Sequence, residues 1–118
     1  MKICWTTIHV GNLEKSLAFY RDLLGLSICR KMDHGKTQIV FFGEEGQTQF
    51  EVICAEGESV ENPGKGISVG FEVENLDAWI ERFRNAGHAV TDPVSPGKVR
   101  FCFVTDPDGY RIQLVEQG

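Results

Sequence analysis

Two segments of the chain share a helical pattern of apolar residues and lie 63 positions apart. In each segment the apolar residues recur every three to four positions, which places them on one side of a helix with about 3.6 residues per turn. The two stripes are formed by Leu13, Leu17, Tyr20 and Leu24, and by Leu76, Ile80 and Phe83. The sequence therefore predicts two amphipathic helices related by an internal repeat.

Both predicted helices have the same start and stop signals. Asn12 and Asn75 stand where an N-cap side chain accepts a hydrogen bond from an orphan backbone N–H. Gly25 and Gly87 follow the stripes, at the place where a left-handed residue commonly ends a helix. Shared signals of this kind support a duplicated structural unit.

Segments of alternating or continuous apolar residues predict strands around each helix. Each helix follows one strand and precedes a short apolar segment and two strands joined by a turn. The short segments are 26–28 and 88–90, and the later strands are expected at 37–42, 48–54, 99–104 and 110–115. We therefore predict an α+β fold in one domain spanning 1–118. Two βαβββ modules, about 1–56 and 67–118, form a curved mixed sheet with both helices on the convex side.

Strand alternation indicates which side chains face away from the helices. A curved sheet with helices outside has a concave inner face, which is where a ligand would lie. The middle strands are apolar on both faces, so the pattern does not assign their side chains. The residues expected on the inner face are Trp5, Thr7, His9, Glu51, Ser68, Glu72, Arg111 and Gln113.

The charge and composition of the chain limit the classes of partner that it is expected to bind. The chain has 12 basic and 17 acidic residues, a balance that disfavours nucleic acid and anionic membrane surfaces as partners. No segment approaches the roughly 18 apolar residues of a membrane helix, and the N-terminus lacks the apolar core of a signal peptide. The expected location is the cytoplasm. The four cysteines match no zinc motif and are expected to be small buried side chains.

Two motifs resemble the glyoxalase/bleomycin resistance protein/dioxygenase family, also called the vicinal oxygen chelate superfamily. Residues 12–26 resemble its D-L-x-x-S-x-x-F-Y-x-x-x-L-G signature, and residues 106–114 resemble its closing D-P-D-G-x-x-I-E-L. The resemblance implies the fold described above, a homodimer, and loops at 30–36 and 92–98 that flank the cavity. It leaves the reaction open, because this fold hosts lyases, dioxygenases, thiol transferases and antibiotic-sequestering proteins.

The resemblance also implies four positions that hold a divalent metal ion in the family's enzymes. These positions match Trp5, Glu51, Ser68 and Gln113 of this sequence. Only Glu51 is a good ligand for such an ion. We therefore expect no metal ion and no other cofactor. A displaced metal site built from His9, Glu51 and Glu72 is the alternative.

The leading hypothesis is a metal-free protein that binds a small organic molecule, similar to the drug-sequestering branch of the family. Glu51 would accept a cationic or N–H-rich group of the ligand, unless Arg111 pairs with it, and Trp5 would offer an aromatic face. The alternative is an enzyme, either a glyoxalase-type lyase resembling lactoylglutathione lyase or a dioxygenase, with Glu51 as catalytic base or metal ligand. A purely structural module would not need polar inner faces.

Overall fold

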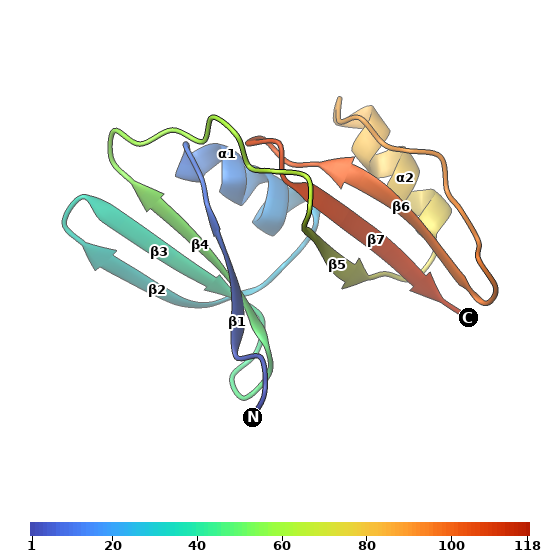
Figure 1. The fold of residues 1–118 in the computed structure, drawn as a ribbon, viewed down its shortest axis with the longest axis horizontal. Helices are drawn as coiled ribbons and strands as arrows, with labels where there is room; N and C mark the ends of the chain where they lie inside the picture. Colours follow the sequence, from blue (N-terminus) through green and yellow to red (C-terminus); the bar gives the residue numbers. More distant parts are fainter. The chain divides into compact units, whose positions relative to one another are not determined.

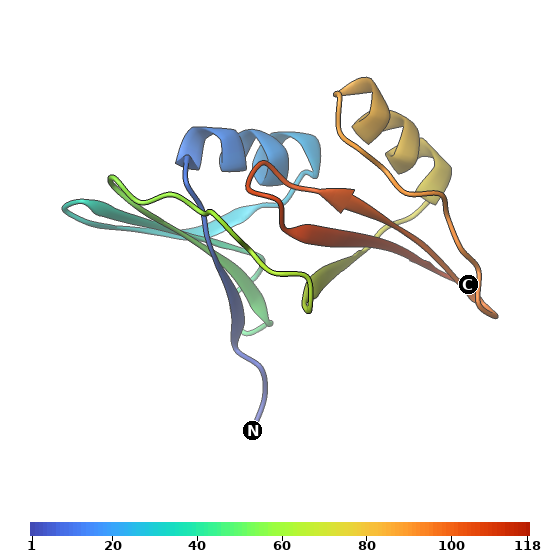
Figure 2. The same cartoon turned by 45° about the horizontal axis from the view of Figure 1, so that its top comes forward.

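The computed structural model describes all 118 residues, which divide into two compact units, Met1–Glu61 and Asn62–Gly118. Each unit contains one sheet and one helical segment that connects its first two strands in the chain (Figures 1 and 2). One sheet has four strands and the other has three. The fold is therefore α+β, as the sequence predicts, and no helix is long and apolar enough to span a membrane.

The first unit has a mixed sheet with the strand order β1-β4-β3-β2. Strand β1 pairs in parallel with β4, and the other neighbours are antiparallel. The helical segment between β1 and β2 lies over one face of this sheet (Figure 2). Its elements are β1 (Trp5–His9), α1 (Leu13–Leu17), η1 (Ala18–Leu23), β2 (Ile28–His34), β3 (Thr37–Phe42) and β4 (Gln49–Ala55).

Strand β2 is longer than the sequence pattern suggested. Residues 30–34, expected to belong to a loop beside the cavity, form antiparallel pairs with β3. The expectation was wrong because the charged residues in this segment do not prevent backbone pairing at the edge of a sheet, where their side chains reach solvent. The register shifts between Ile28 and Arg30, so Cys29 lies in a bulge.

The first helix begins as predicted but widens in its second half. The Asn12 side chain accepts a hydrogen bond from Lys15 N at 3.0 Å, which confirms the N-cap. Further along, Leu24 N donates to Phe19 O at 2.8 Å, a contact five residues back that is typical of a π-helix. This turn buries Phe19 beside Tyr20, with ring centroids 4.8 Å apart, although Phe19 lay outside the predicted stripe.

The core of the first unit lies between the helical segment and one face of the sheet. Tyr20 is fully buried, and its ring centroid lies 5.0 Å from that of Phe50 on β4. The buried apolar side chains of this core are Ile8, Val10, Leu17, Phe19, Tyr20, Leu24, Val40, Phe42, Phe50 and Val52. Alternation along each strand then turns the intervening residues toward the opposite face, which no helix of this unit covers.

The second unit has three strands in the order β5-β7-β6, with β5 parallel and β6 antiparallel to β7. Its elements are β5 (Ser68–Glu72), α2 (Leu76–Asn85), β6 (Val99–Thr105) and β7 (Arg111–Gln117). The strand expected at 88–90 is reduced to isolated bridges, Val90 with Val104 and Val94 with Phe101. Pro93 and Pro96 explain this difference, because proline cannot donate a backbone hydrogen bond to a ladder.

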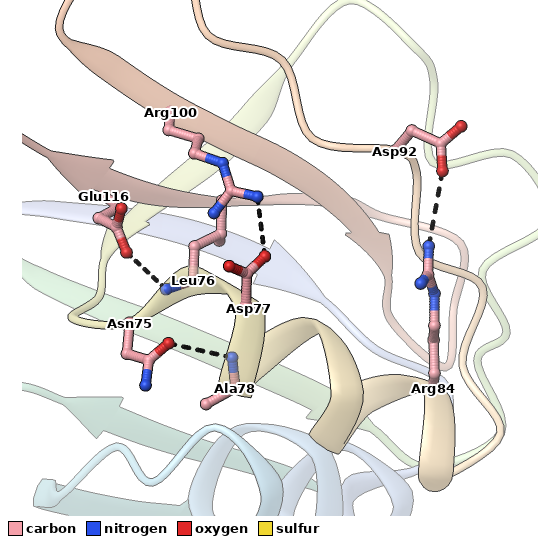
Figure 3. Close-up of polar contacts among 8 residues, drawn as sticks. All are labelled: Asn75, Leu76, Asp77, Ala78, Arg84, Asp92, Arg100 and Glu116. Carbon is pink, nitrogen blue, oxygen red and sulfur yellow. Dashed lines mark hydrogen bonds and ion pairs between the residues drawn. The ribbon is translucent and has the colours of Figure 1, made fainter.

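Three polar contacts position the start of α2 (Figure 3). Asn75 has a left-handed backbone, with φ at 54°, and its side chain accepts from Ala78 N at 3.3 Å. Glu116 on β7 accepts from Leu76 N at 2.6 Å, and Arg100 on β6 pairs with Asp77 at 2.7 Å. Helix α2 is thereby tied to both β6 and β7. It buries Leu76, Ile80 and Phe83, as the stripe predicts, together with Cys102, Val104, Ile112 and Leu114 of the sheet.

The cysteines differ from expectation. Only Cys102 is buried, whereas Cys4 is exposed and both Cys29 and Cys54 are half-buried. Cys102 lies on the face of β6 that packs against α2, while Cys4 precedes the first strand and gains no such cover. A thiol therefore behaves as a core residue only where a helix covers its strand face, as α2 covers Cys102.

Candidate functional site

The face of the first sheet opposite the helical segment carries one row of residues across all four strands. Thr7 on β1 lies opposite Glu51 on β4, and Glu51 lies opposite Phe41 on β3. Phe41 in turn lies opposite Arg30 on β2. Residues in register point to the same side of a sheet, so these four side chains are neighbours on the free face.

Glu51 is the charged member of this row that is buried, with an exposed fraction of 7%. The Thr7 hydroxyl donates a hydrogen bond to Glu51 Oε1. Of the partners expected for Glu51, His9 lies two residues further along β1, whereas Arg111 and Gln113 belong to the second unit. The partner in the structure is therefore Thr7, because it lies directly opposite in the parallel register.

Aromatic and cationic groups surround Phe41. The Trp5 ring meets it edge-on, with centroids 5.5 Å apart and planes at 72°. The Arg30 guanidinium lies 4.3 Å from the Phe41 ring centroid, a cation–π contact. Phe41 is buried, whereas Trp5 stays 47% exposed. Sequence reasoning missed Arg30 and Phe41, because 30–36 was expected to be a loop and β3 is apolar on both faces.

The free face of the second sheet repeats part of this arrangement. Gln113 on β7 lies between Gly70 on β5 and Phe103 on β6. The Arg111 guanidinium lies 3.9 Å from the Phe103 ring centroid. A Cβ placed on Gly70 would lie 3.2 Å from Gln113 Oε1, so the amide reaches over the glycine. Each sheet therefore has a phenylalanine with a stacked arginine beside the central polar residue.

The residues expected to bind a ligand divide between the two free faces. Trp5, Thr7, His9 and Glu51 share the free face of the first sheet by strand parity. Ser68, Glu72, Arg111 and Gln113 share that of the second sheet. The structure thus groups the residues predicted from the sequence into two sets of four, one in each unit.

The side chains at the family's metal positions do not fit a divalent ion. The Trp5 indole has an N–H donor and no lone pair to offer, and Ser68 and Gln113 are neutral. Glu51 is an anionic oxygen ligand, and its Oε1 already accepts from Thr7. Neither unit brings together three His, Cys, Asp or Glu side chains that could hold a metal ion.

Comparisons with known proteins agree with this architecture. The model of the Glyoxalase/Bleomycin resistance protein/Dioxygenase superfamily matches residues 2–114. Lactoylglutathione lyase of Haemophilus influenzae is 33% identical over 98% of this chain and 93% of its own length. The corresponding Salmonella typhimurium protein is 34% identical with the same coverage.

Solved structures are similar as well. Glyoxalase I of Leishmania major, described as trypanothione-dependent, has a TM-score of 0.86 at 28% identity, with 98% of this chain and 86% of that chain covered. TnmS3, an antibiotic-binding protein from Streptomyces sp., has a TM-score of 0.76 at 19% identity, covering 100% of this chain and 97% of that chain, and shows likeness in fold alone. From its motifs, its repeated units and these matches, the chain belongs to the glyoxalase/bleomycin resistance protein/dioxygenase superfamily.

Proposed function

We propose that this protein binds a small organic molecule on the free face of its first sheet and works without the family's divalent metal ion. The observation that carries the proposal is the exchange of a metal ligand for Trp5 beside a retained carboxylate, Glu51. An exposed indole next to a buried acid suits an organic ligand with an aromatic part and a hydrogen-bond donor.

Glu51 has one oxygen available for such a ligand. Thr7 donates to Oε1, and Oε2 has no hydrogen-bond partner within the chain. A ligand N–H directed at a carboxylate forms a charge-assisted hydrogen bond that contributes about 1.5–3 kcal/mol, or about 10- to 150-fold in affinity. The expected role of Glu51 is therefore to accept a cationic or N–H-rich group.

Benzamidine, a planar cation with several N–H groups, is a suitable first probe for this role. Replacing Glu51 with Gln keeps an oxygen for the Thr7 hydroxyl and removes the charge. We expect Glu51→Gln to weaken benzamidine binding at least about tenfold in calorimetric titrations, with an unchanged circular dichroism spectrum. Equal affinities would remove Glu51 from the site, and a collapsed fold would make it a structural residue.

A glyoxalase-type lyase is the second candidate, and the curated relatives favour it. They are named lactoylglutathione lyase and are 33–34% identical over nearly the whole chain. In that case Glu51 would act as the catalytic base or as a metal ligand. In a reaction of this type, a Lewis acid stabilises the oxyanion that develops in the transition state by several kcal/mol. The substitutions at Trp5, Ser68 and Gln113 count against such an ion here.

One activity measurement separates the two candidates. The formation of lactoylglutathione from glutathione and methylglyoxal is followed by thioester absorbance, with Zn²⁺, Ni²⁺ or Mn²⁺ added in turn. The metal-free proposal predicts no rate above that of the uncatalysed mixture. A matched control carries Trp5→His, Ser68→His and Gln113→Glu, which restore metal-binding side chains at the three positions where the family's ligands are replaced. A metal-stimulated rate in the unmodified chain that Glu51→Gln abolishes would establish the lyase.

The proposal also covers the oligomeric state, the cellular location and the biological role of the protein. We propose a homodimer, because edge strands in both sheets leave backbone groups unpaired, β1 and β2 in the first sheet and β5 in the second. Light scattering should then give twice the mass of one chain. A cytoplasmic location and a drug-sequestering role belong to the same proposal, and a protective effect on cells exposed to a bound antibiotic would support the latter.

A further inference from the structure

A cavity of about 240 Å³ opens at the end of the first sheet where β1 and β4 begin. It lies entirely within the first unit and beside Trp5, away from Glu51. Its volume is below the range of drug-sized pockets, so it suits a small planar group or one part of a larger ligand. The lining residues are Lys2, Cys4, Trp5, Cys29, Arg30, Glu45, Gly46, Gln47 and Gln49.

Hydrogen bonds to the β3–β4 turn hold the N-terminal wall of this cavity in place. The Lys2 ammonium donates to Gly46 O at 2.8 Å, and Gln49 N donates to Cys4 O at 3.0 Å. The Thr48 hydroxyl donates to Ile3 O at 2.6 Å. Figure 1 shows the chain before β1 running beside this turn. The cavity is therefore built from two connected segments.

The chemistry of the walls combines an aromatic surface with positive charge. Trp5 presents a half-exposed ring, and its indole N–H has no partner within the chain. Arg30 is held against Phe41 by a cation–π contact and forms no ion pair with any carboxylate of the chain. Lys2 adds a second cation, and Glu45 is the one acidic residue in the lining. The cavity therefore carries a net positive charge.

We propose that this cavity binds a planar organic anion, with the ring against Trp5 and the carboxylate toward Arg30 and Lys2. The proposal rests on the small-molecule function proposed above and adds the chemical class of the ligand. A ligand that places its anion here can direct an N–H group to Glu51 further along the same face. Arginine is suited to this role because its planar guanidinium pairs with a carboxylate through two hydrogen bonds.

Three probes with the same ring test the charge preference: indole-3-carboxylate, indole-3-carboxamide and 3-(aminomethyl)indole. Titrations of the full-length protein are followed by the indole N–H signals in nuclear magnetic resonance spectra, where Trp79 on α2 provides an internal reference. We expect the acid to shift the Trp5 signal and to bind at least about tenfold more tightly than the amide. Binding of the amide or the amine at least as tight as that of the acid would overturn the proposal, as would a Trp5 signal that none of the probes moves.

Charge variants identify the groups responsible. Arg30→Gln should weaken binding of indole-3-carboxylate about tenfold and leave binding of the amide unchanged. Glu45→Gln should strengthen binding of the carboxylate, because it removes the one negative charge of the lining. Lys2→Gln should weaken binding of the carboxylate without disturbing the cation–π contact between Arg30 and Phe41. The matched control is Arg82→Gln, which removes an arginine that lies 5.6 Å from the Trp79 ring centroid and does not line the cavity. No change of acid affinity in both Arg30→Gln and Lys2→Gln would refute the assignment.

Repeating the titrations with Glu51→Gln distinguishes this proposal from the proposed function. Since Glu51 does not line the cavity, the preference for the acid should persist in that variant. If Glu51→Gln loses benzamidine binding but still prefers indole-3-carboxylate over its amide, both proposals are supported. A retained preference in a protein that proves to be a metal-dependent lyase would support the cavity and refute the metal-free function.

Discussion

Thr7 and Glu51 lie directly opposite each other on the parallel strands β1 and β4, and the Thr7 hydroxyl donates to Glu51 Oε1. Burying a carboxylate is costly unless it gains hydrogen bonds in return. The contact therefore accounts for an acidic side chain that is only 7% exposed on the free face of a sheet. It also fixes the orientation of that side chain on the free face.

Removing this hydroxyl should destabilise the first unit. Thr7→Val keeps the shape of the side chain but leaves the Glu51 carboxylate without its donor. We expect the free energy of unfolding, measured by urea denaturation, to fall by about 1–3 kcal/mol. The control is Thr6→Val, which changes the neighbouring threonine on the other side of β1. Equal effects from the two substitutions would show that the contact with Glu51 contributes nothing specific.

The N-cap of α2 should be more sensitive to substitution than that of α1. Asn75 adopts a left-handed backbone, with φ at 54°, whereas Asn12 is extended, with φ at −145°. Asn12→Ala should cost about 1 kcal/mol through the lost cap alone. Asn75→Ala should cost about 2–3 kcal/mol, because alanine adds a conformational penalty of about 1–2 kcal/mol there.

Asn75→Gly separates the two contributions at this position. Glycine tolerates the left-handed backbone but lacks the capping oxygen, so its cost in urea denaturation should be less than that of alanine. A glycine variant as unstable as the alanine variant would mean that backbone conformation plays no part.

The Arg100–Asp77 contact should make a pH-dependent contribution to stability. The hydrogen bond from Arg100 lowers the pKa of the Asp77 carboxyl below its usual value. A carboxyl with a lowered folded pKa stabilises the protein above its unfolded pKa, about 4, and loses that contribution as the pH falls through the folded pKa. The difference in urea midpoint between the unmodified chain and Arg100→Gln should be constant from about pH 5 upward and shrink below about pH 4. A difference that grows on acidification would contradict this account.

The cysteines should differ in reactivity toward alkylating reagents. Burial raises the pKa of the Cys102 thiol, and its side chain is 1% exposed, so little thiolate is accessible at that position. Cys4 is exposed. Iodoacetamide at pH 8, with peptide mapping by mass spectrometry, should label Cys4 in the native protein and Cys102 only after unfolding. Labelling of Cys102 in the native protein at the same rate as Cys4 would show that the core of the second unit opens readily.

Features set by local sequence were predictable. Asn12 and Asn75 act as caps, and the predicted apolar stripes pack against their sheets. Both features depend only on residues that are close together in the sequence. The orientation of Glu51 followed from alternation along its strand. These predictions needed no knowledge of which strands pair.

Features set by pairing between distant segments were not predictable in the same way. The row from Thr7 to Arg30 depends on three strand registers, and a strand such as β3, apolar on both faces, gives no signal of its register. The cation–π contact of Arg30 with Phe41 therefore emerged only from the structure. The bridges at Val90 and Val94 likewise reflect nearby prolines that outweigh a short apolar pattern.

The central claim is that this member of the superfamily works without the divalent ion, and metal analysis of the purified protein tests it most directly. The protein is prepared without chelator, without an affinity tag that binds metal, and in medium supplemented with zinc, nickel, iron and manganese. The variant with Trp5→His, Ser68→His and Gln113→Glu serves as the control that regains ligands. The account predicts far less than one equivalent of any of these metals in the unmodified chain. About one metal ion per chain, lost on Glu51→Ala, would contradict it.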